Sequence, residues 1–307
     1  MSGLSKGPVT TSATLRRCGT IELAVFIGWA PIVVFGAGSA IAEPQGSPTA
    51  QGSTARQAGA DQLETEYNGQ DLTRPQRSFE TRLQFRESEG TTSRADRDIM
   101  LLRYNSKIDL DAGWKLGLLA QVPLVDKKTF APQSSDTEAG IGDSAFQAVL
   151  SRAIDRRWAF GFGARLVAPT AEDSLGSGKW QIMPGFGVRY SFLELGPETY
   201  FVPAVRYAIS VAGDPSKRNI SQPEIAPTLN IGLPERWFVI FYPSFDVRIN
   251  YGDPISGQTG RLFLPFDLAV GRKVTNGLTM SLEASVPIIK DYPVYSFKTE
   301  LRIVMQF

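Results

Sequence analysis

Apolar and polar side chains alternate along most of the chain after residue 77. From Tyr295 to Phe307 the odd positions are mostly apolar, whereas the even positions include Lys298, Glu300 and Arg302. Successive side chains of a β-strand point to opposite faces, so this pattern predicts a strand with one apolar and one charged face. The strand ends on an aromatic residue, although chain termini are usually polar and frayed.

The same alternation recurs about twelve times, with no convincing helical period between the repeats. Each repeat sets large apolar residues on one face against charged, polar or glycine residues on the other. The predicted strands cover residues 79–86, 100–110, 114–122, 143–150, 158–166, 181–192, 200–211, 222–233, 237–251, 262–270, 278–286 and 295–307. The predicted fold class is therefore all-β.

The predicted connections alternate in length. Those at residues 111–113, 153–157, 193–199, 234–236 and 275–277 are short, and those at 87–98, 123–141, 170–180, 212–220, 252–260 and 287–293 are longer and polar. Short turns at one rim and long loops at the other are typical of transmembrane β-barrels. We therefore expect residues 78–307 to form a transmembrane antiparallel up-and-down β-barrel with both termini in the periplasm. A soluble β-sandwich is the alternative, but it does not require this alternation.

Aromatic residues lie near the ends of the predicted strands. Trp114, Trp158 and Trp237 each follow a short turn, and Tyr251 and Tyr295 lie near long loops. Trp and Tyr favour the boundary between lipid and water, where the ring is buried and its N–H or O–H stays hydrated. We expect these five residues to form girdles at the two membrane interfaces; in a sandwich they would be core residues.

The first 77 residues contain no predicted strand. Two arginines precede an apolar stretch from Leu23 to Phe35, and small residues follow it, which predicts a secretory signal peptide at residues 1–42. A short anchor helix is the alternative, although Pro31 interrupts it. Residues 43–77 are polar and small, so we expect a disordered periplasmic linker, or one helical turn there that plugs or docks.

Composition excludes several classes of function. The net charge is +1, which gives no reason to expect a nucleic-acid partner, and the chain contains no histidine. Outer-membrane hydrolases and acyltransferases use histidine as a general base, so we do not expect an enzyme. The one cysteine, Cys18, lies in the predicted signal peptide. We find no phosphate-binding loop, no dense carboxylate metal site and no cofactor motif, and we predict that no cofactor is bound.

The charged faces of the predicted strands would line the barrel lumen, because lipid excludes charge from the outer face. The predicted lumen-lining residues are Arg82, Arg103, Lys107, Lys115, Asp143, Arg165, Arg189, Arg206, Glu224, Asp246, Arg248, Asp267, Glu283, Lys298, Glu300 and Arg302. Two interpretations stay open for this set. The basic residues would line a water-filled pore that favours anions, or the opposite charges would pair across a narrow lumen and close it.

Two short pieces of sequence resemble a known family. Gly140 to Ser144 reads GIGDS, and Pro169 to Trp180 reads PTAEDSLGSGKW before the strand that opens with Gln181-Ile182-Met183-Pro184. These pieces resemble the MetA-pathway-of-phenol-degradation family of outer-membrane transporters. The resemblance implies an outer-membrane barrel and suggests that Asp143, Lys179 and the 170–180 loop matter. Alternatively, the loop is an ordinary exposed turn.

The terminal strand carries a second resemblance. Its final Phe307 is similar to the terminal aromatic residue of Gram-negative outer-membrane β-barrels, which the barrel assembly machinery reads as an assembly signal. The resemblance implies insertion into the bacterial outer membrane by that machinery. Outer-membrane lipid and the barrel assembly machinery are therefore the expected partners, together with a small-molecule solute.

The function expected from the sequence is a channel or transporter for passive passage of small solutes, anionic or aromatic ones among them, through a charged lumen. The alternative is a non-conducting structural or adhesion barrel whose extracellular loops bind a partner. The sequence leaves the transported solute and the oligomeric state open.

Overall fold

A computed structural model describes residues 71–307, except residues 90–93, 132–133, 173 and 197. The predicted signal peptide, residues 1–42, and residues 43–70 of the predicted linker lie outside the described residues. None of the helices in the described residues is long and apolar enough to cross a membrane.

The described residues form fourteen strand segments in one antiparallel sheet. They are β1 (Ser78–Glu89), β2 (Arg94–Asp109), β3 (Trp114–Ala131), β4 (Ser134–Ile141), β5 (Ser144–Ala153), β6 (Trp158–Ala168), β7 (Lys179–Ser191), β8 (Tyr200–Gly213), β9 (Ser221–Gly232), β10 (Trp237–Phe241), β11 (Val247–Ile249), β12 (Leu262–Lys273), β13 (Leu278–Lys290) and β14 (Phe297–Gln306). β4 and β5 both pair with β3, and β10 and β11 both lie between β9 and β12. These two pairs each act as one strand, so the described residues make a twelve-strand barrel.

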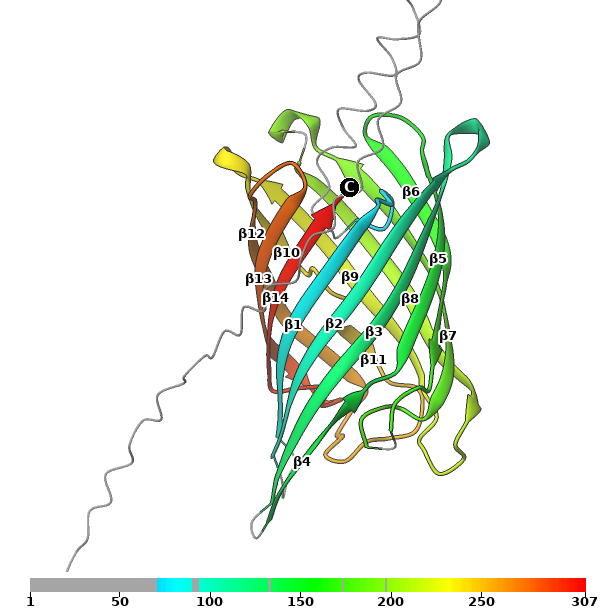
Figure 1. Cartoon of the computed structure of the whole chain (residues 1–307), viewed down its shortest axis with the longest axis vertical. Helices are drawn as coiled ribbons and strands as arrows, with labels where there is room; N and C mark the ends of the chain where they lie inside the picture. The colour runs from blue at the N-terminus through cyan, green and yellow to red at the C-terminus, as the bar shows by residue number, and fades with distance from the viewer. Residues whose placement is uncertain (1–70, 90–93, 132–133, 173, 197) are drawn as a thin grey trace, which may run out of the picture. The chain divides into compact units, whose positions relative to one another are not determined.

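The first and last strands close the barrel. β1 pairs antiparallel with β14, with Phe79 opposite Met305 and Phe85 opposite Thr299. This closure, visible in Figure 1, joins the first and last strands of the described residues into one barrel and rules out a sandwich of two sheets. The predicted antiparallel up-and-down barrel is confirmed.

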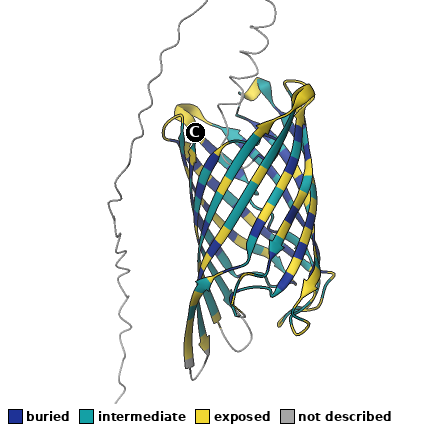
Figure 2. Cartoon of the chain, turned by 45° about the vertical axis from the view of Figure 1, so that its right-hand side comes forward, coloured by how far each residue is buried: buried dark blue, intermediate teal, exposed yellow. Residues whose placement is uncertain are grey.

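The barrel wall alternates between exposed and buried positions, as the banding in Figure 2 shows. Large apolar side chains such as Phe146, Phe162 and Phe186 are exposed on the outer face, whereas charged residues such as Arg302 and Glu300 are buried on the inner face. An apolar exterior around a charged interior is the arrangement that lipid requires of a closed barrel. The protein is therefore located in the bacterial outer membrane, as expected.

The two ends of the barrel differ in their connections. We call the end with the connections β2–β3, β5–β6, β7–β8, β9–β10 and β12–β13 the turn end, and the opposite end the loop end. The C terminus lies at the turn end (Figure 1). Three connections at the turn end are built on short 3-10 turns, at Asp111–Gly113, Leu193–Leu195 and Pro234–Arg236.

Two of the predicted long loops are largely strand. Residues 87–98 and 123–141 belong mostly to β1, β2, β3 and β4, which extend beyond the predicted bounds. These extensions carry charge on both faces; Lys127 Nζ, for example, lies 3.1 Å from Glu138 Oε2. No apolar face marks the strand period there, which is why the alternation did not reveal it.

The predicted strand 237–251 is broken at residues 242–246. Tyr242 has a φ of 52°, which interrupts the extended backbone, and the proline that follows cannot donate to a neighbouring strand. The alternation predicted for residues 237–251 places Phe245 outward, on the same face as Trp237 and Tyr251. Its ring instead lies beside the lumen residue Arg206, whose guanidinium carbon is 4.4 Å from the ring centroid. The prediction was wrong here because the break changes which face the side chains take.

Candidate functional site: the barrel lumen

One side of the lumen is filled by buried ion pairs. We call it the paired side; it is formed by Glu80 and Arg82 of β1, Glu283 of β13, Lys298, Glu300 and Arg302 of β14, Asp267 of β12 and Asp246 from the 242–246 break. Arg82 Nε donates to Glu80 Oε1 at 2.6 Å, and Arg302 Nε donates to Glu300 Oε1 at 2.9 Å. All eight side chains are less than one-tenth exposed.

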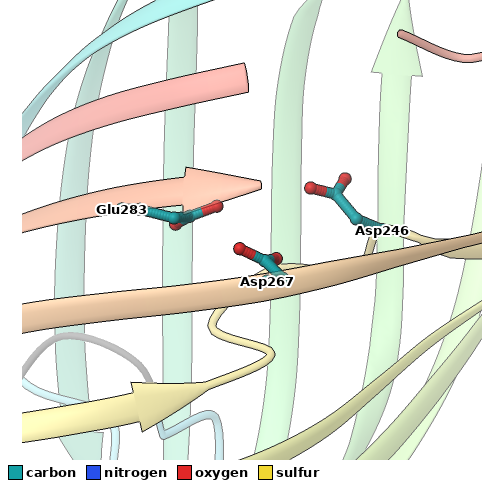
Figure 3. Close-up of side chains that lie close together, drawn as sticks. All are labelled: Asp246, Asp267 and Glu283. Carbon is teal, nitrogen blue, oxygen red and sulfur yellow. The ribbon is translucent and has the colours of Figure 1, made fainter. Parts of the chain in front are cut away.

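Three carboxylates of the paired side converge from different segments, as Figure 3 shows. Oxygen atoms of Asp246, Asp267 and Glu283 lie within 4.8 Å of one another. The ammonium group of Lys298 contacts Asp246 and Glu283 and lies 3.9 Å from Asp267 Oδ2. Because this ammonium occupies the position that a metal ion would take, the cluster fits an internal counter-ion better than a bound metal.

Ion pairs continue from the paired side in both directions around the lumen. Arg103 Nη1 of β2 lies 3.7 Å from Glu80 Oε2. On the other flank, Arg248 Nη2 donates to Asp246 Oδ1 at 3.2 Å, and Arg206 Nε donates to Glu224 Oε2 at 2.6 Å. The chain of opposite charges thus runs from Arg103 on one flank to Arg206 on the other.

The opposite side of the lumen, which we call the open side, is the inner face of β2, β3, β5, β6 and β7. Arg165 of β6 donates from Nη2 to Gln121 Oε1 at 2.7 Å, and Arg103 Nε donates to the same oxygen at 2.7 Å. No carboxylate of the described residues forms an ion pair with Arg165. Two guanidinium groups therefore share one neutral amide oxygen, which leaves uncompensated positive charge at this point.

A second pair of arginines lies nearer the loop end. Arg86 of β1 is directly opposite Arg97 of β2, and neither forms an ion pair with a carboxylate in the described part of the chain. Like charges in directly opposite positions destabilise a sheet, and an anion between them relieves the repulsion. The arginine pairs at two depths make the open side an electropositive surface.

Residues 71–77, assigned from the sequence to the disordered linker, lie inside the lumen. Arg189 Nη1 donates to Asp71 Oδ2 at 3.2 Å, and Arg74 packs on the Tyr200 ring at 5.6 Å from its centroid. Leu72 fits against Gly187, where an added Cβ would lie 3.2 Å from its Cδ1 atom. Gly161 of β6 and Gly187 of β7, both of which lie against Leu72, therefore make room for this segment.

The loop between β6 and β7 folds over the loop end. Asp143 Oδ2 accepts hydrogen bonds from Ser177 N–H and Ser177 Oγ, both at 2.7 Å, and Leu175 is buried beneath the loop. Asp143 thus holds this loop in place at the edge of the lumen. Lys179, at the start of β7, is also buried.

A cavity of about 610 Å³ remains between these elements. Leu72 and Pro75 line it toward the turn end, and Leu175, Ser177 and Tyr292 line it toward the loop end. Of the predicted lumen residues, the cavity is lined by Arg82, Arg103, Asp143, Arg165, Arg206, Glu224, Asp246, Arg248 and Lys298. The passage is therefore bounded by segment 71–77 at one end and by loops at the other.

The remaining predicted lumen residues do not line this cavity. Lys107 Nζ lies 3.7 Å from Asp109 Oδ2, close to the turn end, and Lys115 is half-buried near the start of β3. Arg189 holds Asp71. The others, Asp267, Glu283, Glu300 and Arg302, are buried within the paired side.

Four of the five predicted girdle residues lie at the outer surface, where arginines cover three of them. The guanidinium carbons of Arg152, Arg272 and Arg261 lie 5.7, 5.4 and 5.2 Å from the ring centroids of Trp114, Trp237 and Tyr251, respectively. Trp158 is exposed and packs on Tyr190.

Tyr295 corrects the girdle prediction. It is only 1% exposed, and its hydroxyl group bonds Ser285 Oγ at 2.7 Å and Asp246 Oδ2 at 3.2 Å. β14 begins only at Phe297, so the residues before it do not share the alternation of the strand. Tyr295 therefore points inward.

Sequence reasoning missed the lumen segment at Asp71 and Leu72, the inward ring of Phe245 and the convergence of Asp246 with Asp267. The glycine pairs in β6 and β7 were the one available signal, because a glycine-lined wall leaves space for another segment. The other two features depend on the break at residues 242–246.

Comparisons with known proteins agree with this architecture. An outer membrane channel from Pseudomonas putida F1 is similar in structure, with a TM-score of 0.58 and 14% identity over 76% of this chain and 96% of that chain. The NanC porin has a TM-score of 0.45 and 11% identity, over 75% of this chain and 98% of its own. The beta domain of the Bordetella autotransporter BrkA has a TM-score of 0.47 and 10% identity, over 76% of this chain and 100% of its own. At 14% identity, the likeness to the Pseudomonas channel shows the fold alone.

A search of curated protein sequences returned no match. The model of a family described as "Putative MetA-pathway of phenol degradation" matches residues 73–232. The match begins within the lumen segment and runs to the end of β9, which confirms the resemblance found in GIGDS and the 169–180 stretch. Because it covers more than half of the chain, this protein belongs to that family.

Proposed function

We propose that the protein is a passive channel for small solutes that favours anions over cations, and that it carries no enzymatic activity. The observation that carries this proposal is the cavity of about 610 Å³, whose lining includes Arg86, Arg97 and Arg165, three arginines that form no ion pair with a carboxylate of the described residues. Within a membrane, a water-filled space bounded by fixed positive charge attracts anions and repels cations.

The arrangement along the lumen supports this direction of selectivity. Arg86 and Arg97 lie toward the loop end, and Arg103 and Arg165 lie deeper. An anion that enters from the loop end would meet two electropositive stations in sequence. The acidic residues, in contrast, are held mostly in ion pairs on the paired side.

Planar-bilayer recording on protein purified from outer membranes tests the proposal. We expect discrete single-channel steps and a reversal potential, in a KCl gradient, that indicates a preference for chloride. Arg165→Glu should shift that reversal potential toward the value expected for potassium, because it replaces a positive charge by a negative one beside the Gln121 side-chain amide.

Arg156→Glu is the matched control, because the same charge change falls on an exposed turn-end residue outside the lumen. A silent bilayer with a folded, heat-modifiable barrel would reject the channel and favour the adhesion alternative. A potential that shifts equally in both variants would mean that Arg165 does not border the conducting path.

We also propose that Phe307 is the assembly signal read by the barrel assembly machinery. Its ring is 73% exposed at the turn end and stacks on Tyr104 with the centroids 6.5 Å apart. Deleting Phe307 should lower the amount of barrel in the outer membrane, measured by heat-modifiability of membrane fractions, before it changes single-channel conductance. Normal membrane levels of the truncated chain would contradict this role.

A further inference from the structure

The cavity wall on the open side is partly apolar, which is unusual for the polar interior of a membrane barrel. Along the inner face of β2, Ile99 and Leu101 lie between Arg97 and Arg103, and all four line the cavity. A strand rises about 3.3 Å per residue, so the two arginines are separated by roughly 20 Å of backbone with aliphatic side chains between them.

The neighbouring strand extends this apolar surface. In the β2–β3 register Ile99 is opposite Val125, and Leu101 is opposite Pro123. Both pairs lie on the loop-end side of the pair formed by Arg103 and Gln121. Leu101 and Val125 are each 7% exposed. The apolar surface thus continues across β2 and β3 and ends at the side-chain amide of Gln121.

The β6–β7 wall repeats the arrangement. Met183 is directly opposite Arg165, and Val167 lies two residues farther toward the loop end on the same face. Met183 packs with Ile220 of the segment before β9, and Val167 packs against them. An aliphatic patch therefore borders each of the two arginines that share Gln121.

We propose that this part of the lumen is a binding site for a small carboxylate with an aliphatic body. The carboxylate would accept hydrogen bonds from Arg103 and Arg165, and the aliphatic body would lie against Leu101, Val125 and Met183. The charge complementarity fixes the orientation, because the unpaired positive charge lies at the deep end of the apolar surface. This inference rests on the proposed function, since it names the class of anion that the channel accepts.

The test is a chain-length series of acetate, butyrate and hexanoate, added at neutral pH to the chloride-conducting channel. If the site exists, each methylene that becomes buried should lower the half-blocking concentration by roughly two- to fourfold. Met183→Gln should flatten the series and leave the block by acetate and the chloride preference in place, whereas Met183→Leu should preserve the series. Arg165→Gln should weaken the block by all three acids by a similar factor.

Equal block by hexanoate and acetate, in a channel that still prefers chloride, would overturn the site and leave the channel proposal standing. A channel that conducts without anion preference would instead contradict the proposed selectivity. If no current is recorded, calorimetric titration of the same three acids into detergent-solubilised protein measures their affinity for the site directly. A chain-length dependence there would support the site, and its absence would reject it.

Segment 71–77 carries a second, independent inference. Its turn is closed internally, because Thr73 N–H and Thr73 Oγ1 donate to Asp71 Oδ1 at 2.8 and 2.6 Å. It contacts the wall mostly through side chains: Asp71 pairs with Arg189, and Leu72 and Pro75 lie against glycines. One backbone hydrogen bond, from Phe307 N–H to the carbonyl oxygen of Arg77 at 3.3 Å, holds its C-terminal end. A compact segment that is held mainly by side chains can move out of the lumen without breaking the pairing between the strands of the barrel.

We infer that residues 71–77 form a movable plug that limits conductance at the turn end. A disulfide between Pro75→Cys and Gly117→Cys in a Cys18→Ser background tests this, because Pro75 Cβ lies 2.7 Å from the position of a Cβ at Gly117 and a disulfide joins Cβ atoms about 3.8 Å apart. The oxidised double variant should stay at its lowest conductance, and reduction should produce steps to a level at least about twofold higher.

Leu72→Ala, with no cross-link, should increase the fraction of time spent at the higher level. The control for the disulfide experiment is the same Pro75→Cys, Gly117→Cys variant after reduction and treatment with a thiol-blocking reagent. This blocked protein must still show the higher conductance steps. Identical conductance of the oxidised and reduced forms would overturn the movable plug. A higher conductance of Leu72→Ala without any redox effect would do the same, because it would indicate a fixed constriction.

Discussion

The two sides of the lumen are built from the same residue types but behave differently. On the paired side, Lys298 and Arg302 are each at most 2% exposed, and carboxylates surround both. On the open side, Arg165 meets one neutral amide and borders a cavity. An arginine or lysine in a barrel lumen is therefore not in itself a pore-lining charge, because its role depends on what the neighbouring strands supply.

The difference has a simple physical origin. Glu80, Glu283 and Glu300 come from β1, β13 and β14, and these neighbouring strands bring all three carboxylates to Arg302. The inner faces of β6 and β7 carry glycines and aliphatic residues next to Arg165 instead. Opposite charges therefore pair on one side of the lumen, whereas Arg165 on the other side has no carboxylate partner among the described residues, and the preference for anions is proposed from that second side.

The largest expected effect comes from removing the central cation of the paired side. Lys298→Met would remove the ammonium group that Asp246 and Glu283 share and leave each carboxylate with one arginine partner, and breaking such a buried pair costs about 3–5 kcal/mol. We expect a correspondingly lower free energy of unfolding, measured by urea titration of the barrel in detergent micelles with heat-modifiability as the readout.

Arg165→Met is the matched change on the open side. It removes a buried cation that has no carboxylate partner, so the free energy of unfolding should change by about 1 kcal/mol or less, while chloride preference falls. Equal losses of stability in the two variants would break the distinction between the sides.

A smaller effect is expected from filling the wall beside the lumen segment. An added Cβ at Gly187 would lie 3.2 and 3.3 Å from the two Cδ atoms of Leu72, which can shift, and 3.2 Å from Ala204 Cβ. Gly187→Ala should therefore change the free energy of unfolding by about 1 kcal/mol or less and should increase the mean single-channel conductance as Leu72 is displaced. An unchanged conductance distribution would mean that the segment tolerates the methyl group in place.

The smallest effect is expected from an ion pair outside the lumen, between two turn-end connections. Arg157 donates to both carboxylate oxygens of Glu194, with Nη1 at 3.0 Å from Oε2, and these hydrogen bonds lower the pKa of Glu194 from 4.5 to about 2. A carboxyl group with a lowered pKa in the folded state stabilises the fold above its ordinary pKa, and this contribution is lost as the pH falls toward 2.

Glu194→Gln should therefore lower stability slightly at neutral pH and should match the unmodified protein near pH 2, because both partners of the pair are exposed to solvent. Urea midpoints measured across that pH range check the prediction. A difference that grows as the pH falls would have the wrong sign for this pair.

Much of the fold could be predicted because the strands of a membrane barrel alternate apolar and polar side chains with a period of two residues. The outward phenylalanines of β5, β6 and β7 and the closing strand before Phe307 follow from alternation alone. Prediction failed where the period was absent or broken. The β3 and β4 extensions carry charge on both faces beyond Val125, Tyr242 interrupts a strand, and Tyr295 precedes the start of β14.

The candidate site was predictable only as a set of inward-facing charges. The alternation predicts that Arg165 and Arg302 both face the lumen, because the face that a side chain takes depends only on whether its position in the strand is odd or even. It does not identify their partners, because pairing depends on the depth of each residue after the barrel has closed and on which strands lie across from it.

By itself, the sequence determined the twelve-strand membrane barrel, its apolar exterior and its charged interior, since each of these is a local consequence of period-two patterning in lipid. Tertiary structure alone decided which charges neutralise one another, where residues 71–77 lie, and that Asp143 holds the loop at one end of the cavity. Those outcomes depend on contacts between residues far apart in the chain, which only the closed barrel brings within hydrogen-bonding distance.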